Sequence, residues 1–148
     1  MMERVLFLCV HNSARSQMAE GMVRAWAGDR FDAHSAGNEA TEVRPLAIQA
    51  MNEIGIDISG QRSKSTATYE GQTFDRVITV CSDAVEACPY FPGAKARDRW
   101  DLDDPVAATG TDEQRLDAFR RVRDEIADHV RGLIDARPII TTEEGGPG

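Results

Sequence analysis

The alternation of apolar and polar positions along the chain predicts strands that alternate with helices. Residues 4–10 and 74–82 form largely apolar runs that end in turn-forming residues, which is typical of strands buried inside a parallel sheet. A third short strand is predicted at residues 31–37, and a fourth within residues 95–105.

Three segments repeat apolar residues at helical spacing and predict helices at residues 16–28, 44–55 and 111–136. Pro45 lies near the start of the second helix and Gly55 follows its end, as helix boundaries favour. The residues expected to pack from the first helix are Met18, Met22, Val23 and Trp26. Those expected to face inward from the last are Leu116, Phe119, Val122, Ile126, Val130, Leu133 and Ile134.

This order of elements predicts an α/β fold, a three-layer sandwich in which a four-stranded parallel sheet is flanked by helices. In such folds, ligands bind beyond the carboxyl ends of the strands. Cys9 and Cys81 each lie at the carboxyl end of a predicted strand. Two thiols are therefore expected at the functional edge of the sheet.

Length and composition narrow the class of protein. The 148 residues suffice for one domain, expected at residues 1–137, and residues 138–148 are small and polar and predict a disordered tail. The net charge of −8 argues against binding nucleic acid or an anionic membrane surface. No apolar run approaches the ~20 residues of a membrane span, and the first residues lack the pattern of a signal peptide. We expect a cytoplasmic monomer.

The cysteine count fits that location. Cytosolic thiols stay mostly reduced, so three cysteines indicate catalysis, redox chemistry or inert burial rather than a structural framework. No cofactor or catalytic metal is expected, because His34 and His129 have no second ligand at metal spacing.

The loop after the first strand has the chemistry of an oxyanion cradle. It lies between a strand and a helix, where backbone amides and the helix N-terminus converge on one anion, and it comprises Val10, His11, Asn12, Ser13 and Ala14. Arg15 adds a bidentate grip on the anion, and the same positive groups favour a Cys9 thiolate below it. Ser16 is expected to hydrogen-bond Cys9, and Asn12 to hold a left-handed turn. The alternative is an inert, buried Cys9 beside a surface arginine.

Several motifs together resemble a known family. They are CVHNSARSQMAEG, SAG, DIS, VCSDAVEACP, WDLDDP and RVRDEI, which extend from Val5 to about Leu133. They are similar to the arsenate reductases that share the low-molecular-weight tyrosine phosphatase fold. The resemblance is strongest to the thioredoxin-coupled branch, because all three of its redox cysteine positions are present.

The resemblance implies a relay of three thiols. Cys9 attacks arsenate and forms a thiol–arsenic adduct, Cys81 displaces arsenite to give a Cys9–Cys81 disulfide, and Cys88 moves the disulfide to Cys81–Cys88. Thioredoxin, or a similar thiol donor, then reduces this last pair. Arg15 holds the oxyanion. Reduction of As(V) takes two electrons, so a second thiol must displace the first, which is the logic of thiol–disulfide exchange.

The resemblance places the general acid at Asp104, directly before Pro105, and leaves Asp103 as the neighbouring alternative. A phosphatase of the same fold remains the second hypothesis, since it needs only Cys9, Arg15 and this acid. The aromatic pair that follows the acid in such phosphatases is absent, because Val106 and Ala107 stand there. A weak activity on aryl phosphates is still expected. An anion-binding or redox-sensor module is a third hypothesis.

The spacing of the last two cysteines carries a conformational prediction. Seven residues of helix rise about 10 Å, whereas the Cα atoms of a disulfide lie about 4.4–6.8 Å apart. The segment from Ser82 to about Arg97 is therefore expected to unwind or loop out when Cys81 and Cys88 join.

The thioredoxin-coupled branch often binds potassium beside the cradle. The resemblance places the equivalent positions at Asn12, Glu20, Ser35 and Lys64. Here a lysine stands at the last of them, and an ammonium can replace a monovalent cation by bonding Glu20 and Asn12. The sequence thus predicts activity that does not depend on potassium, with an exposed loop lysine as the alternative.

Overall fold

The computed structural model describes residues 2–82 and 88–136. Its strands form one sheet in the order β2-β1-β3-β4, in which all neighbours pair in parallel. The strands are β1 (Glu3–Leu8), β2 (Phe31–Ala36), β3 (Phe74–Thr79) and β4 (Ala94–Arg99). All four correspond to predicted strands, and the parallel α/β fold is confirmed.

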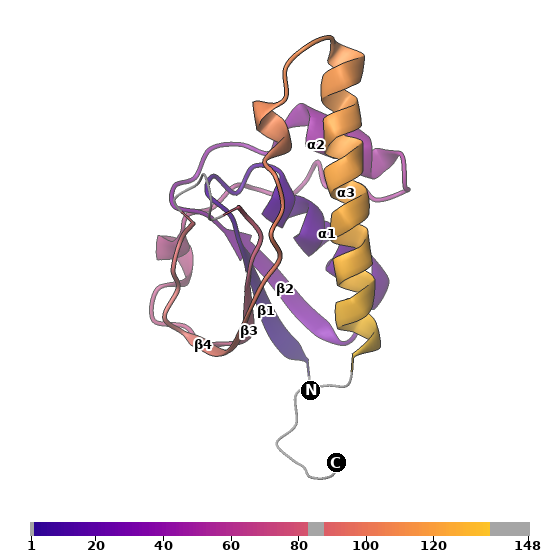
Figure 1. The fold of residues 1–148 in the computed structure, drawn as a ribbon. Coiled ribbons are helices and arrows are strands. Elements are labelled where there is room, and N and C mark those ends of the chain that lie inside the picture. Colours follow the sequence, from indigo (N-terminus) through magenta and orange to yellow (C-terminus); the bar gives the residue numbers. More distant parts are fainter. Residues whose placement is uncertain (1, 83–87, 137–148) are drawn as a thin grey trace.

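The helices lie on both sides of this sheet (Figure 1). The α-helices α1 (Arg15–Ala27), α2 (Pro45–Asn52) and α3 (Asp112–Asp135) cover one face together. The 3-10 helix η1 (Thr66–Tyr69) covers the other, and a second one, η2 (Pro105–Ala107), precedes α3. The hydrophobic pattern predicted the three α-helices within a residue or a few of their ends, but neither 3-10 helix.

Alternation along β1 divides the core in two. Val5 and Phe7 point into the large cluster beneath the α-helices, whereas Leu6 and Leu8 point to a smaller cluster that contains Tyr69 of η1. These four side chains of β1 are fully buried, and each contributes about 1.5–3 kcal/mol of hydrophobic stabilisation. The sheet therefore holds the start of the cradle loop rigidly from both faces.

The helix packing follows most of the predicted apolar faces. Met18, Met22 and Val23 of α1 are fully buried, but Trp26 is 38% exposed and has the Arg131 guanidinium over its ring. The prediction that Trp26 packs in the core is therefore wrong. It lies in the last turn of α1, where the neighbouring Ala27 is buried and the Trp26 ring faces Arg131 of α3 instead.

The sheet order brings the two strand-end cysteines to one edge. Between β1 and β3 the chain reverses its direction of winding, and at such a switch point the carboxyl ends form a crevice. The Val80 amide donates to the Leu8 carbonyl at 2.7 Å, so the chain just before Cys81 is tied to the residue just before Cys9.

Two expectations concern residues outside the described ranges. The expected tail at residues 138–148 and the central part of the segment after Cys81, residues 83–87, are not among the described residues. The expected unwinding as far as Arg97 is wrong for its last part, since Ala94–Arg99 form β4 while the Cys81–Cys88 disulfide is present.

Of the helices described, none combines the length and apolar character needed to span a membrane.

Candidate active site

Cys9 lies at the carboxyl end of β1 with its thiol held by Ser16. Its side chain is 2% exposed and is not in a disulfide, and its Sγ lies 2.8 Å from Ser16 Oγ. Asn12 Nδ2 donates to the same Oγ at 2.7 Å. Because Ser16 Oγ already accepts from Asn12, the hydroxyl hydrogen is available to donate to sulfur. This arrangement places a hydroxyl donor beside the Cys9 sulfur.

The orientation of the Asn12 amide is fixed by its other neighbours. Its Oδ1 accepts from the Lys64 backbone amide at 2.7 Å and from Gln17 Nε2 at 2.8 Å, which leaves Nδ2 on the Ser16 side. The backbone of Asn12 has φ 52°, the left-handed conformation expected of this residue. The predicted Ser16–Cys9 contact and the predicted Asn12 turn are both confirmed.

The carbonyl groups of the cradle loop are bonded to surrounding segments. Because C=O and the next N–H lie on opposite sides of a trans peptide, outward carbonyls turn the following amides inward, towards the cradle. The contacts are Asn38 N to Val10 O at 2.8 Å, Thr41 Oγ1 and Ser63 Oγ to His11 O at 3.1 Å each, Gln17 Nε2 to Asn12 O at 3.1 Å, and Arg44 N to Ser13 O at 2.9 Å. The loop is thus preorganised to receive an anion.

Gly37 lets the loop after β2 approach the cradle closely. A Cβ at this position would lie 2.7 Å from Asn12 N and 2.8 Å from the carbonyl oxygens of Cys9 and Val10. These are backbone atoms of the cradle itself, so a side chain here would displace them. Gly37 lies within the SAG motif, but its role was not apparent from the sequence.

The N-terminus of α1 keeps its positive end available. Its N-cap is Ala14, which makes no side-chain cap, and its first turn carries no acidic residue. In contrast, Thr111 and Gln114 cap α3 with a complete capping box. Uncapped amides at a helix start favour an anion, and here they adjoin the cradle loop.

Arg15 connects the cradle to the loop that carries the candidate acid. Its side chain is 3% exposed, and its Nη1 donates to the Leu102 carbonyl at 2.9 Å while its Nη2 lies 3.8 Å from Asp104 Oδ2. Asp104 is anchored by its other oxygen, which accepts from Val106 N at 3.0 Å and caps η2. The neighbouring Asp103 is exposed. Of the two aspartates, Asp104 is thus the one that the structure brings to Arg15.

Cys81 and Cys88 form a disulfide whose Cα atoms lie 6.3 Å apart. Cys81 is fully buried, whereas Cys88 is half-buried. The pair therefore joins a buried residue, next to the strand edge that carries Cys9, to one that is partly exposed.

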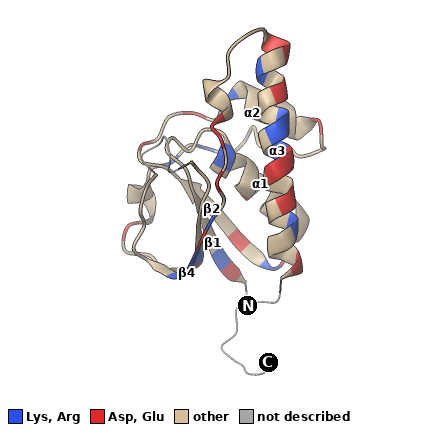
Figure 2. Cartoon of the chain, in the orientation of Figure 1, with Lys and Arg blue, Asp and Glu red and all other residues tan. Residues whose placement is uncertain are grey.

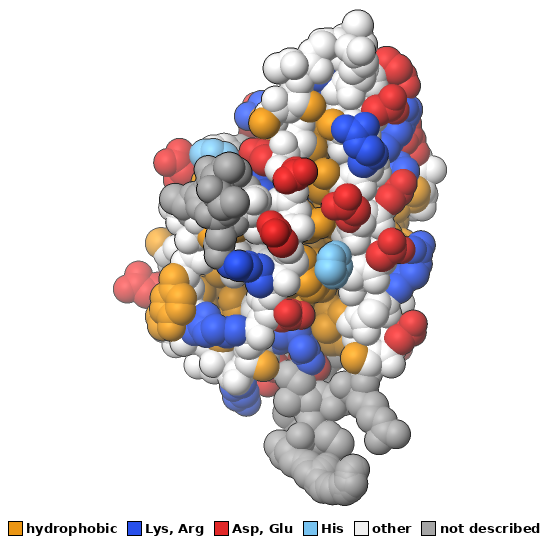
Figure 3. Space-filling model, in the orientation of Figure 1, with side chains coloured by type: hydrophobic (Ala, Val, Ile, Leu, Met, Phe, Trp, Pro, Cys, Tyr) orange, Lys and Arg blue, Asp and Glu red, His pale blue; other side chains and the backbone are white. Residues whose placement is uncertain are grey.

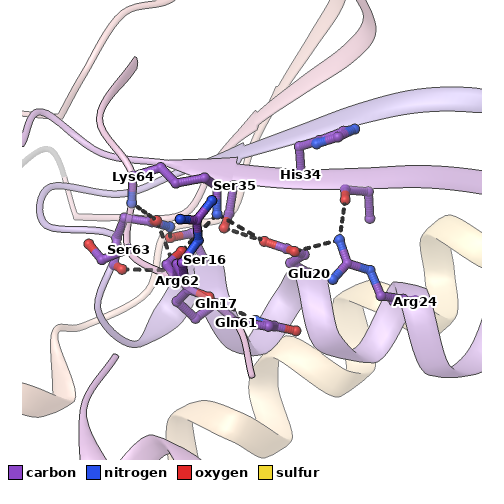
Figure 4. Close-up of polar contacts among 12 residues, drawn as sticks. Ser16, Gln17, Glu20, Arg24, His34, Ser35, Gln61, Arg62, Ser63 and Lys64 are labelled. Atoms are coloured by element: carbon purple, nitrogen blue, oxygen red, sulfur yellow. Dashed lines mark hydrogen bonds and ion pairs between the residues drawn. The ribbon is translucent and has the colours of Figure 1, made fainter. Parts of the chain in front are cut away.

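Three of the predicted cation-site residues, Glu20, Ser35 and Lys64, lie near one another (Figure 4), and the fourth, Asn12, accepts from the Lys64 backbone amide. The buried Glu20 accepts from Ser35 Oγ, pairs with Arg24 at 2.6 Å and lies 3.8 Å from Lys64 Nζ. Lys64 Nζ also donates to the Arg62 carbonyl at 2.8 Å. Burial lowers the pKa of Lys64, and the Glu20 carboxylate opposes part of that shift.

One expected contact in this cluster is wrong. Asn12 was expected to bond the Lys64 ammonium, but its Oδ1 accepts from the Lys64 backbone amide and from Gln17. Because Glu20 already faces the Lys64 ammonium and Arg24, these residues do not fit a potassium ion while Lys64 is in place. Among the described residues, no group of three or more His, Cys, Asp or Glu side chains is placed to hold a metal.

A cysteine and an arginine around a strand–loop–helix anion cradle, with an aspartate opposite, define a class of α/β proteins that act on tetrahedral oxyanions. The chain belongs to the low molecular weight phosphotyrosine protein phosphatase family, whose model matches residues 4–138. The family predicted from the sequence motifs is confirmed.

Arsenate reductases are among the proteins to which the chain is similar. One from Halalkalibacterium halodurans is 49% identical over 127 residues, which cover 86% of this chain and 91% of that protein. A solved arsenate reductase in its phosphate-binding state has a TM-score of 0.76 at 38% identity and covers 90% and 97% of the two chains. A thioredoxin-dependent arsenate reductase from Corynebacterium glutamicum has a TM-score of 0.65 at 29% identity, covering 90% of this chain and 60% of that one.

The positions singled out from the sequence therefore fall into three groups, which are the cradle, the Cys81–Cys88 pair, and the cluster around Glu20. The cradle holds Cys9, residues 10–14, Arg15 and Ser16, with Asp104 facing it. Sequence reasoning missed the residues that shape the cradle from outside, which are Gln17, Gly37, Thr41, Arg44 and Ser63. Polar loop residues carry no periodic signal, so only the folded chain reveals these contacts.

Proposed function

We propose that the protein reduces arsenate to arsenite with its own three thiols and passes the resulting disulfide to a thiol donor. One observation carries this proposal: Cys9 is free at the anion cradle while Cys81 and Cys88 are joined at the neighbouring strand end. A phosphatase has no use for the second and third thiols. A two-electron reductase needs them.

In the first step, the Cys9 thiolate attacks arsenic in a bound arsenate. An As–O bond breaks, Asp104 supplies the proton to the leaving oxygen, and water departs. Arg15 and the cradle amides offset the oxyanion charge. Ser16 holds the sulfur as a thiolate before attack. Arsenic is still As(V) at this stage, and it is bound covalently to Cys9 Sγ as a thiol–arsenic adduct.

In the second step, the Cys81 thiolate attacks Cys9 Sγ. The S–As bond breaks and its electron pair leaves with arsenic as arsenite, while a Cys9–Cys81 disulfide forms. Cys88 then attacks Cys81 Sγ and frees the Cys9 thiolate. In total, one arsenate gains two electrons, and the thiols of Cys81 and Cys88 supply them as they form the Cys81–Cys88 disulfide.

Thioredoxin is the donor that we propose to reset the protein. Because Cys88 is the more exposed of the two residues, the incoming thiolate attacks Cys88 Sγ and the Cys81 thiolate leaves. A second donor thiol resolves the mixed disulfide, so that the donor becomes oxidised. The need for reduced thiols between turnovers supports a cytoplasmic location. The monomeric state stays a prediction.

Arsenate-dependent NADPH oxidation in the presence of thioredoxin and its reductase tests this function. The wild type should turn over repeatedly, and Cys9→Ser, Cys81→Ser and Cys88→Ser should each abolish catalytic turnover. Repeated turnover of Cys88→Ser with thioredoxin alone would overturn the relay. An inactive wild type would overturn the reductase itself.

Phosphate-ester hydrolysis is the second function that the site supports. Arg15 lies between the cradle and Asp104, and these groups with Cys9 suffice for hydrolysis of a phosphoester. We therefore propose a weak activity on aryl phosphates such as p-nitrophenyl phosphate. Cys81→Ser and Cys88→Ser should retain it, whereas Cys9→Ser should lose it.

Lys64 is proposed to take the place of a monovalent cation beside the cradle. Its ammonium faces Glu20, and its backbone amide fixes the Asn12 side chain that supports Ser16. Ser35 and Arg24 complete the hydrogen bonds and charges around Glu20. A covalently attached cation at this position makes the cradle independent of the potassium concentration.

A further inference from the structure

An open hollow of about 450 Å³ lies at the sheet edge next to the disulfide. It is lined by Thr79, Pro89, Tyr90, Arg97, Asp98 and Arg99. Thr79 is two residues before Cys81, and Pro89 directly follows Cys88. The walls of the hollow are therefore continuous with both cysteines of the pair.

The charge of this edge is opposite to that of the whole protein. The chain carries a net charge of −8, yet β4 presents Arg97 and Arg99 as exposed side chains on the outermost strand of the sheet. Side chains two apart share a face, and the strand register pairs these arginines with Val77 and Thr79 of β3. Figure 3 shows basic side chains gathered over the region where Figure 2 labels β4.

An ordered aromatic side chain completes the surface. Tyr90 is 73% exposed, far more than the other large apolar side chains among the described residues. The Arg97 guanidinium lies 4.5 Å from the centre of its ring and donates to Tyr90 Oη at 3.2 Å and to the Pro92 carbonyl at 3.1 Å. Tyrosine and arginine are among the residue types that anchor protein interfaces, and here Arg97 contacts a tyrosine that lies two residues after Cys88.

We propose that Tyr90, Arg97 and Arg99 form the docking surface for the protein that reduces the Cys81–Cys88 disulfide, a dithiol reductant with acidic side chains around its reactive cysteine. The inference rests on the proposed function, since it assigns where the thiol donor binds. A net-negative donor would be repelled by the rest of this acidic chain. A local basic surface beside Cys88 both attracts it and orients its thiolate towards this half-buried residue.

The exchange itself is balanced within the two proteins. The donor thiolate attacks Cys88 Sγ, the Cys81 thiolate leaves, and the second donor thiol then displaces Cys88. Two electrons pass from the donor dithiol to the pair, and the donor ends as a disulfide. Docking sets the encounter rate and leaves this chemistry unchanged, so a small dithiol that needs no docking surface should be indifferent to these residues.

The test measures reduction of the oxidised protein directly, without arsenate. Reduced bacterial thioredoxin of net negative charge is mixed with wild type, Arg97→Glu and Arg131→Glu, and the second-order rate constant is followed by thioredoxin fluorescence. Arg131 is a matched control, because its guanidinium also lies over an aromatic ring, that of Trp26, but on α3. Dithiothreitol replaces thioredoxin in parallel reactions.

Arg97→Glu should slow reduction by thioredoxin about tenfold at low ionic strength, and the difference should shrink in 0.5 M salt. Its reduction by dithiothreitol, and both reactions of Arg131→Glu, should stay within about twofold of wild type. An unchanged rate with thioredoxin, an equal loss in Arg131→Glu, or an equal loss with dithiothreitol would each overturn the docking surface. Because no arsenate is present, these outcomes are separate from failure of the proposed reductase activity.

Discussion

Ser16 Oγ lies 2.8 Å from Cys9 Sγ and also accepts a hydrogen bond from Asn12 Nδ2, which leaves its hydroxyl hydrogen free to donate to the sulfur. A hydrogen bond to a charged group contributes about 1.5–3 kcal/mol. The contact thus links the shape of the loop, set by Asn12, to the reactivity of the thiol.

Replacing Ser16 with alanine should lower the rate of arsenate reduction about tenfold or more by removing this donor. The rate of Cys9 alkylation by iodoacetamide, measured against pH, should also change, because the sulfur loses its hydroxyl neighbour. Ser59→Ala, at an exposed serine outside the site, should behave as wild type. Equal alkylation profiles for Ser16→Ala and wild type would contradict the proposed hydrogen bond.

The two adjacent aspartates offer a matched pair of variants. Asp104→Asn should reduce turnover about a hundredfold, the usual contribution of a general acid, because only Asp104 lies beside Arg15. Asparagine can still cap η2, so the fold should persist. Asp103→Asn should stay within about twofold in the same steady-state assay. Loss of activity in Asp103→Asn instead would transfer the acid role to Asp103.

Gly37→Ala should distort the cradle, since the new Cβ would meet backbone atoms of Cys9, Val10 and Asn12 within 2.8 Å. The expected cost is about 1–3 kcal/mol in the free energy of unfolding, together with weaker phosphate binding by calorimetry. At Gly60 a Cβ would meet nothing within 4 Å, so Gly60→Ala is the control. Equal stability and equal phosphate affinity in both variants would show that the close approach has no consequence.

The Lys64 cluster predicts indifference to potassium. Wild-type turnover in KCl and in NaCl of equal ionic strength should agree within about twofold, because the Lys64 ammonium already faces Glu20. Lys64→Gln should lose activity in NaCl and regain part of it in KCl. A wild type that is stimulated severalfold by potassium would contradict the replacement.

A charged contact between α2 and α3 predicts a specific pH dependence of stability. The hydrogen bond from Arg120, and a further one from Arg123, lower the pKa of Glu53 from 4.5 to about 2. A carboxyl with a lowered pKa stabilises the fold above its unfolded value, and this contribution fades as the pH falls from 4.5 towards 2.

The Tm of Glu53→Gln should therefore lie below that of wild type at pH 6, and the difference should vanish near pH 2. Glu125→Gln, at an exposed carboxylate further along α3, serves as the control in thermal unfolding. A difference between Glu53→Gln and wild type that does not change with pH would contradict the ionic contact.

The sequence predicted those features that depend on local pattern. Apolar runs and helical spacing located the four strands and three α-helices, and the chemistry of the strand–loop–helix junction located Cys9, Arg15 and Ser16. Contacts that join distant segments were not predictable in this way, such as Gly37 against Asn12 or the Leu102 carbonyl against Arg15. The exposure of Trp26 was not predictable either, because its spacing fits the buried face of α1 but the fold leaves it near the surface.

The most direct test of the three-thiol relay is a disulfide map made at a single turnover. Fully reduced protein receives one equivalent of arsenate, the reaction is quenched with acid and an alkylating agent, and peptides are identified by mass spectrometry. The relay predicts one arsenite per Cys81–Cys88 disulfide in wild type and a trapped Cys9–Cys81 disulfide in Cys88→Ser. Release of arsenite without either disulfide would contradict it.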